Sequence, residues 1–158
     1  MDIAVCVSFE KLQELEMDQS LSIFRKPTEQ YKALLDISRD GCVTIAYEHQ
    51  TIIAYVTFHK PGSDESWAED VTGELIELGA VEVSTEYRAQ RLAEKILKAT
   101  FDSGMFDHTI VFATMYFWHY DLKRTGLSDF AYKRLLDKLY RKAGLLPFAT
   151  TDPEIRSS

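Results

Sequence analysis

Two repeating patterns of apolar and polar residues run along this chain, and each marks one type of element. Residues 42–47 and 51–58 alternate β-branched and aromatic residues across a short polar link, which predicts a β-hairpin. Short apolar runs bounded by polar residues are typical of further strands. Four of these are expected, over residues 3–8, 75–84, 109–118 and 145–149.

Apolar residues at helical spacing occur between these strands. Ser8 is suited to cap one helix, and Pro27 to begin a second that stops at Gly41. Four helices are expected, over about residues 9–17, 27–40, 92–102 and 129–142. The periodicity indicates a mixed α and β chain, and 158 residues that are 46% hydrophobic are enough for a single domain with a full core.

The charge balance narrows the class of partner. Twenty-five acidic and 18 basic residues give a net charge of -7, which disfavours nucleic acid and anionic membranes as partners. No basic start with a following apolar run and no long apolar segment occurs, so we expect a cytoplasmic protein without membrane attachment. Cys6 and Cys42 have no metal-ligand spacing and are expected to be buried free thiols, so no metal site is predicted.

The most informative segment is residues 77–99, where an apolar strand runs through a polar turn directly into a helix. A helix start presents free backbone NH groups and the positive end of the helix dipole. Such a layout binds anions, and phosphate in particular. The segment therefore predicts a site for a phosphate-bearing cofactor.

The turn Arg88–Ala93 resembles the Gln/Arg-x-x-Gly-x-Gly/Ala pyrophosphate loop of the GNAT family of N-acetyltransferases, and the lead-in Tyr87-Arg88 is common in that family. Arg91 stands where the family usually has glycine, and Ala89 where glycine is frequent. The resemblance implies an α+β fold, with a central mixed, mostly antiparallel sheet flanked by helices. It also implies acetyl-CoA as co-substrate and no metal.

Site residues follow from the same resemblance. The strand backbone at Val81 and Val83 would hydrogen-bond the pantetheine arm. The turn would hold the pyrophosphate through Arg88, Ala89, Gln90, Arg91, Leu92 and Ala93.

Acetyl transfer to an amine needs a base, because an amine with a pKa of about 10.4 is mostly protonated at pH 7. Counting back from Arg88, Glu77 occupies the position of the catalytic glutamate in the histone-acetylating branch of the family, and Glu82 is the second candidate. Gly79 between them suits a β-bulge, so the sequence does not show whether both face one side. Three tyrosines are candidates for protonating the leaving thiolate: Tyr116, Tyr120 and Tyr132.

Longer stretches resemble one branch of the family, the acetoin-utilisation acetyltransferases, which modify a lysine of acetyl-CoA synthetase. These stretches are residues 24–25, 51–57, 75–83, 116–123 and 148–155. The resemblance implies a protein lysine as acceptor, whose basic surroundings the acidic loop 64–70 would attract. Relatives continue beyond the Pro-Glu-Ile segment, so we expect the family's last helix and strands to be absent here.

Two other functions stay open at this point. One is an altered GNAT-like module that binds an acyl-CoA or a protein without turnover, and the other is an N-acetyltransferase for small amines. A homodimer that completes the sheet is also compatible with the sequence.

Overall fold

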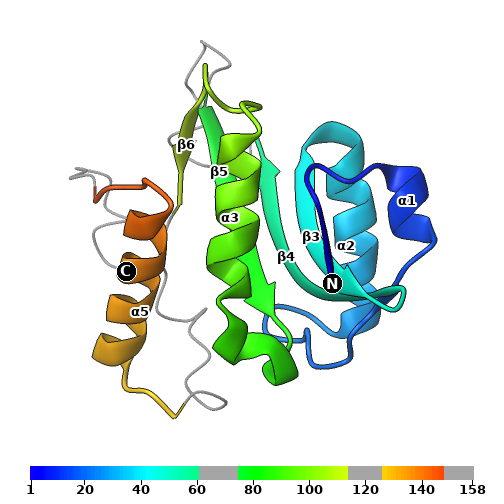
Figure 1. The fold of residues 1–158 in the computed structure, drawn as a ribbon, viewed down its shortest axis with the longest axis horizontal. Helices are drawn as coiled ribbons and strands as arrows, with labels where there is room; N and C mark the ends of the chain where they lie inside the picture. Colours follow the sequence, from blue (N-terminus) through cyan, green and yellow to red (C-terminus); the bar gives the residue numbers. More distant parts are fainter. Residues whose placement is uncertain (61–74, 114–125, 148–158) are drawn as a thin grey trace.

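The computed structural model describes residues 1–60, 75–113 and 126–147, and the strands in these ranges form a single mixed sheet (Figure 1). The strands are β1 (Asp2–Ala4), β2 (Glu16–Met17), β3 (Cys42–Glu48), β4 (Thr51–His59), β5 (Leu75–Val83) and β6 (Ile110–Phe112). Their order is β1-β3-β4-β5-β6, with β2 also paired to β4. The β2–β4 and β5–β6 pairs are parallel and the other three antiparallel, which confirms the expected mixed, mostly antiparallel sheet.

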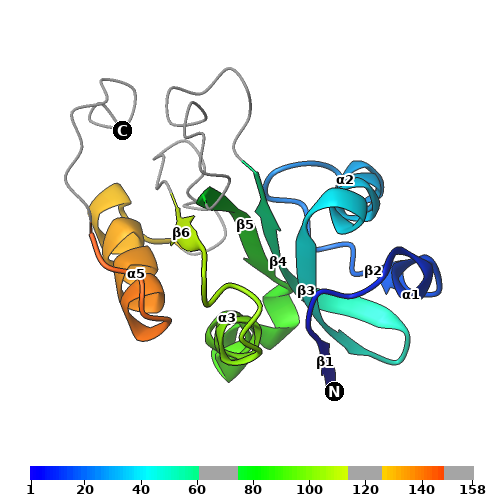
Figure 2. The same cartoon turned by 90° about the horizontal axis from the view of Figure 1, so that it is seen from above.

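Helices cover both faces of this sheet. They are α1 (Phe9–Gln13), α2 (Pro27–Asp40), the 3-10 helix η2 (Thr85–Gln90), α3 (Leu92–Asp102) and α5 (Asp129–Lys142). Helices α1 and α2 lie on one face and α3 on the other, while α5 lies beside β6 and α3 (Figures 1 and 2). The expected helices α2 and α5 are confirmed.

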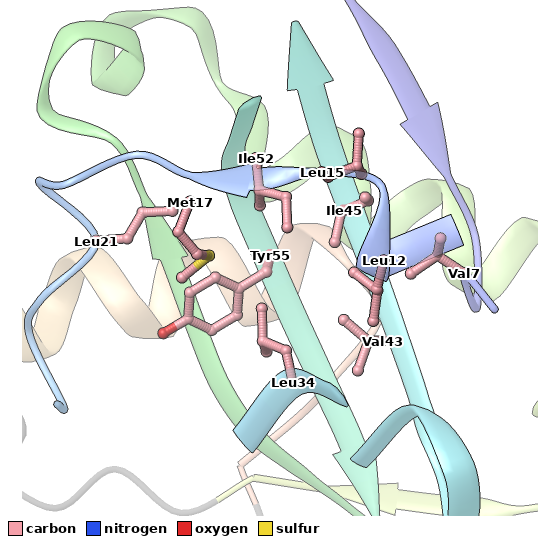
Figure 3. Close-up of a cluster of buried hydrophobic side chains, with 10 residues drawn as sticks. All are labelled: Val7, Leu12, Leu15, Met17, Leu21, Leu34, Val43, Ile45, Ile52 and Tyr55. Carbon is pink, nitrogen blue, oxygen red and sulfur yellow. The ribbon is translucent and has the colours of Figure 1, made fainter. Parts of the chain in front are cut away.

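The two faces carry separate apolar clusters. Leu12 of α1 and Leu34 of α2 pack on Val43, Ile45 and Tyr55 of the sheet in the first cluster (Figure 3). Leu92, Ile96 and Leu97 of α3 pack on the opposite face in the second cluster, whose sheet residues include Val56, Phe58 and Leu78. Burial of side chains of this size stabilises the fold by roughly 1.5–3 kcal/mol each.

The first predicted helix is shorter than the sequence suggested. It ends at Gln13, and residues 16 and 17 form β2 instead. The amide of Glu16 donates to the carbonyl of Gln50 at 2.8 Å, and that of Asp18 to the carbonyl of Ile52 at 3.1 Å. These hydrogen bonds to residues at and just before the start of β4 replace those of one more helical turn. They depend on residues far away in the sequence, so the local periodicity does not predict them.

The prediction of two free thiols was wrong, because Cys6 and Cys42 form a disulfide. Strand β1 pairs antiparallel with β3, with Ala4 opposite Ile45. Extending this register brings the chain after β1 to the start of β3, and the two cysteine Cα atoms lie 4.7 Å apart. The bridge therefore joins the N-terminal segment to the sheet.

The remaining strand predictions are confirmed in part. The strand predicted over 109–118 is present as Ile110–Phe112, and residues 114–118 lie outside the described ranges. The strand predicted at 145–147 was wrong, because α5 ends at Lys142 and the amide of Leu145 turns back to donate to the carbonyl of Tyr140 at 2.8 Å. Residues 148–149 and the acidic loop 64–70 also lie outside the described ranges.

Candidate functional site

A cavity of about 350 Å³ lies between the end of β5, the start of α3 and one side of α5. Strand β5 lines it with Val81, Glu82 and Val83, and Ile23 adds to the same wall. The turn and the start of α3 contribute Arg88, Arg91, Leu92, Ala93 and Glu94. Helix α5 contributes Tyr132, Leu135, Leu136, Lys138, Leu139 and Lys142. The cavity thus has an apolar strand and helix on its sides and a helix start at one end.

The start of α3 is shaped by the backbone of Arg91. This residue has φ 56° and ψ 35°, the left-handed conformation that glycine adopts most easily. The geometry explains why glycine suits this position of the turn. The first i→i−4 bond of α3 runs from the Lys95 amide to the Arg91 carbonyl at 3.1 Å, and no side chain caps the helix. The amides of Leu92, Ala93 and Glu94 therefore face the helix end, where an anion is favoured.

Basic side chains surround this helix start. Arg88 and Arg91 line the cavity from the turn, and Lys138 and Lys142 line it from α5. The Arg88 Nε donates to the carbonyl of Val83 at 3.4 Å, and Lys142 pairs with Glu94 at 3.7 Å. The chain as a whole is acidic, so this local concentration of cations marks a preference of the cavity for an anionic ligand.

A β-bulge at Gly79 determines where the two candidate glutamates point. Thr57 lies opposite Ala80 and Phe58 opposite Leu78, so Gly79 is the extra residue of β5. Tyr55 and His59 are four residues apart on β4 and share a face, and their partners are Glu82 and Glu77. The bulge therefore brings both glutamates to the face covered by α2.

Within the described ranges, two groups donate hydrogen bonds to the carboxylate of Glu82. The residue lines the cavity and is only 2% exposed. The backbone amide of Ile23 donates to Oε1 at 2.8 Å, and the Tyr55 hydroxyl donates to Oε2 at 2.6 Å. Burial, together with the charge and the hydrogen bond of Glu82, raises the pKa of Tyr55 far above its usual range, so the phenol stays protonated as a donor.

Glu77 is placed differently. It is 8% exposed and lies opposite His59 on β4 and Phe112 on β6. It is not among the residues that line the cavity, and neither are Ala89 and Gln90, which are exposed in η2. The cavity does bring together seven of the ten residues suggested by the sequence: Val81, Glu82, Val83, Arg88, Arg91, Leu92 and Ala93.

Sequence reasoning missed the contribution of α5 to this cavity. Of the three tyrosines proposed as thiolate acids, Tyr132 lines the cavity, and Tyr116 and Tyr120 lie outside the described ranges. The apolar face of α5 was visible in the sequence, but it indicated only core packing. Its flanking residues Lys138 and Lys142, next to an apolar stripe, also line the cavity.

The described ranges contain no group of three or more His, Cys, Asp or Glu residues arranged to hold a metal ion. None of the helices described is long and apolar enough to span a bilayer.

Comparison with known proteins extends these observations. Residues 9–114 match the Acetyltransferase (GNAT) family. Over 153 residues the chain is 38% identical to the acetoin utilization protein AcuA of Bacillus subtilis (strain 168) and 37% identical to AcuA of Bacillus licheniformis, matches that span 96% of this chain and 73% of each relative.

Solved structures show the same relationship. An acetoin utilization protein from Exiguobacterium sibiricum 255-15 superposes with a TM-score of 0.93 at 35% identity, over 100% of this chain and 77% of its own. A ribosomal-protein-alanine N-acetyltransferase from Brucella melitensis biovar Abortus 2308 has a TM-score of 0.57 at 16% identity, over 96% of each chain, and shows the shared fold alone. The fold expected from the pyrophosphate-loop resemblance is confirmed.

Proposed function

Because the chain belongs to the GNAT family of acetyltransferases, we propose that it transfers the acetyl group of acetyl-CoA to the side-chain amine of a protein lysine. The resemblance to acetoin-utilisation acetyltransferases makes acetyl-CoA synthetase the first acceptor to test. The observation that carries the proposal is that Glu82, a buried acidic residue, lines the same cavity as a cationic helix start.

The cavity has the chemistry that acetyl-CoA requires. The amides at the start of α3, with Arg88 and Arg91, suit the pyrophosphate. The edge of β5 at Val81 and Val83 offers backbone groups for the amides of pantetheine. The apolar face of α5, with Leu135 and its neighbours, suits the aliphatic part of the arm.

The reaction needs a proton acceptor near the thioester. At pH 7 deprotonation of a lysine ammonium with a pKa of about 10.4 costs roughly 4–5 kcal/mol. Glu82 would take the ammonium proton, directly or through a water molecule. The amine nitrogen then attacks the acetyl carbonyl carbon and the new C–N bond forms. The nitrogen loses its second proton as the C–S bond breaks, and this proton passes to the departing thiolate of coenzyme A. A thiol pKa near that of cysteine, about 8.5, makes this thiolate a good leaving group, and Tyr132, which lines the cavity, is the candidate to relay the proton to it.

Of the two candidate bases, the geometry favours Glu82. Glu82 is among the residues that line the same cavity as the residues proposed to hold the cofactor. Glu77 lies on the same face of β5 but five residues earlier, beside β6, and it does not line this cavity. The count back from Arg88 favoured Glu77, whereas position relative to the cavity favours Glu82.

The test compares Glu82→Gln with Glu77→Gln. We expect Glu82→Gln to lower kcat by about 100-fold or more, the usual contribution of a general base, with an acetyl-CoA Kd within about twofold of the parent. Glu14→Gln, an exposed charge change at the end of α1, controls for net charge. Full activity of Glu82→Gln together with loss of activity in Glu77→Gln would identify Glu77 as the base instead.

The acceptor is tested separately from the base. Purified acetyl-CoA synthetase, a lysine peptide and an aminoglycoside are offered with acetyl-CoA, and acetylation is read by mass spectrometry. Titration calorimetry with acetyl-CoA, desulfo-CoA and ATP measures binding. Binding of the CoA forms without transfer to any acceptor would support the non-catalytic module, and transfer to the aminoglycoside alone would support a small-amine enzyme.

A further inference from the structure

We propose that Tyr55 is a positioning residue for acetyl transfer, which acts by holding the carboxylate of Glu82 ionised and in a fixed orientation. The inference rests on the proposed role of Glu82 as the base. It adds a residue from the neighbouring strand that touches neither coenzyme A nor the acceptor.

The ring and the hydroxyl of Tyr55 lie in different surroundings. The residue lies in the middle of β4, directly opposite Glu82, and is 0% exposed. Its ring packs among the apolar side chains on the α2 face, and its hydroxyl oxygen points away from them (Figure 3). That hydroxyl donates to Glu82 Oε2 at 2.6 Å.

Packing alone does not explain this hydroxyl. A phenylalanine would fill the same volume, and a buried hydroxyl costs free energy unless it is hydrogen-bonded. A short hydrogen bond to an ionised carboxylate is about twice as strong as one between neutral groups. The tyrosine therefore stabilises the charged form of Glu82, which is the form that accepts a proton.

A second donor fixes the direction of the carboxylate. The Ile23 amide binds Oε1, and it belongs to the segment between β2 and α2. Ser20 anchors this segment to the end of β5, since its hydroxyl bonds Ser84 Oγ at 3.1 Å and accepts from the Thr85 amide at 3.1 Å. The carboxylate is thus bonded from two different elements, which restricts its rotation.

Other charged groups line the same cavity or lie close to Tyr55. Arg88 and Arg91 line the cavity from the turn, and Tyr132, Lys138 and Lys142 line it from α5, with Glu94 paired to Lys142. Arg25, bonded to Gln30 at 3.4 Å, acts on Tyr55 through its charge. Tyr55→Phe removes the hydroxyl and leaves these charged groups in place, so it isolates the contribution of the hydroxyl.

The test is the pH profile of kcat/KM for Tyr55→Phe, measured on the full chain. Loss of a donor to the ionised form raises the pKa of Glu82, so the acid limb should move up by about one pH unit. We expect kcat at pH 7 to fall about tenfold, with the KM for acetyl-CoA within about twofold of the parent.

Tyr31→Phe is the matched control, because it also removes a tyrosine hydroxyl from the α2 face. That hydroxyl donates to the carbonyls of Leu12 at 2.6 Å and Leu15 at 2.9 Å, and not to Glu82. Tyr31→Phe should reduce thermal stability and leave the acid limb unchanged. A shift in Tyr55→Phe but not in Tyr31→Phe supports the positioning role.

Three results would overturn the inference. An unchanged acid limb and kcat in Tyr55→Phe, with Glu82→Gln inactive, would refute the role of Tyr55 and leave Glu82 as the base. Full activity of Glu82→Gln would refute the roles of both Glu82 and Tyr55. If Tyr55→Phe does not fold, fluorotyrosine at position 55 retains the shape and strengthens the donor, and an acid limb that fails to move downward would refute the role.

Discussion

Replacing Arg91 tests both the backbone and the charge of the candidate pyrophosphate turn. Its left-handed backbone, at φ 56° and ψ 35°, disfavours every residue with a β-carbon. Arg91 is also exposed and is one of the residues that line the cavity. Arg91→Ala removes the charge and keeps the strain, whereas Arg91→Gly removes both. The pair of variants therefore separates the two contributions.

The expected sizes follow from the geometry. A non-glycine residue in the left-handed conformation destabilises the folded protein by about 1–2 kcal/mol. Glycine removes this strain, but its greater flexibility in the unfolded chain destabilises the folded protein by roughly 0.5–1 kcal/mol. Arg91→Gly should thus be about 0.5–1 kcal/mol more stable than Arg91→Ala, which raises the Tm by roughly 2–3 °C in a chain of this size. Loss of an exposed charge pair worth about 1 kcal/mol should weaken acetyl-CoA binding about fivefold in both variants.

Thermal unfolding without ligand and titration calorimetry with acetyl-CoA measure these two effects. The difference in affinity should shrink at high salt, because exposed charges are screened. Equal stability of the alanine and glycine variants would refute the argument from backbone strain. Unchanged affinity in both variants would show that the guanidinium does not contact the phosphates.

Two further predictions concern stability. The disulfide Cys6–Cys42 closes a loop with a sequence separation of 36 residues, so its reduction should lower the free energy of unfolding by about 4 kcal/mol. Urea unfolding that a reductant does not change would contradict the bridge. A hydrogen bond from the Tyr87 hydroxyl, at 2.6 Å, lowers the pKa of the Glu48 carboxyl in the folded protein below its value in the unfolded chain. The bond therefore stabilises the folded protein above the unfolded pKa, and this stabilisation is lost as the pH falls through the folded pKa. Tyr87→Phe should make the free energy of unfolding less dependent on pH in this acidic range, and an identical dependence in both proteins would argue against this bond.

Elements specified by local signals were predictable from the sequence. Helix α5 begins where the Ser128 hydroxyl accepts from the Ala131 amide at 3.2 Å, and Gly144 with φ 97° follows its end. Both are short-range features, as are Pro27 at the start of α2 and the polar link in the hairpin. The candidate pyrophosphate turn was also recognisable in the sequence, because its residues are consecutive.

Features that depend on register were not predictable. The disulfide requires the pairing of β1 with β3, and β2 requires a partner more than 30 residues away. The bulge at Gly79 was anticipated, but its effect on Glu77 and Glu82 depends on which residues of β4 they face. The hydrogen bond from Tyr55 to Glu82 follows from that same register, so no pattern along one strand revealed it.

Helix α5 has a further consequence for the dynamics of the protein. None of its residues is fully buried, and Leu135 is 51% exposed. Half-buried Leu139 and Tyr140, with the Lys142–Glu94 pair, hold it to α3, so its detachment should cost less free energy than opening the buried strand β4. A ligand that touches α3 and α5 at once adds its binding free energy to their association. Amide hydrogen exchange in α5 should then slow when the cavity fills, so that cofactor occupancy and the docking of this helix become one equilibrium.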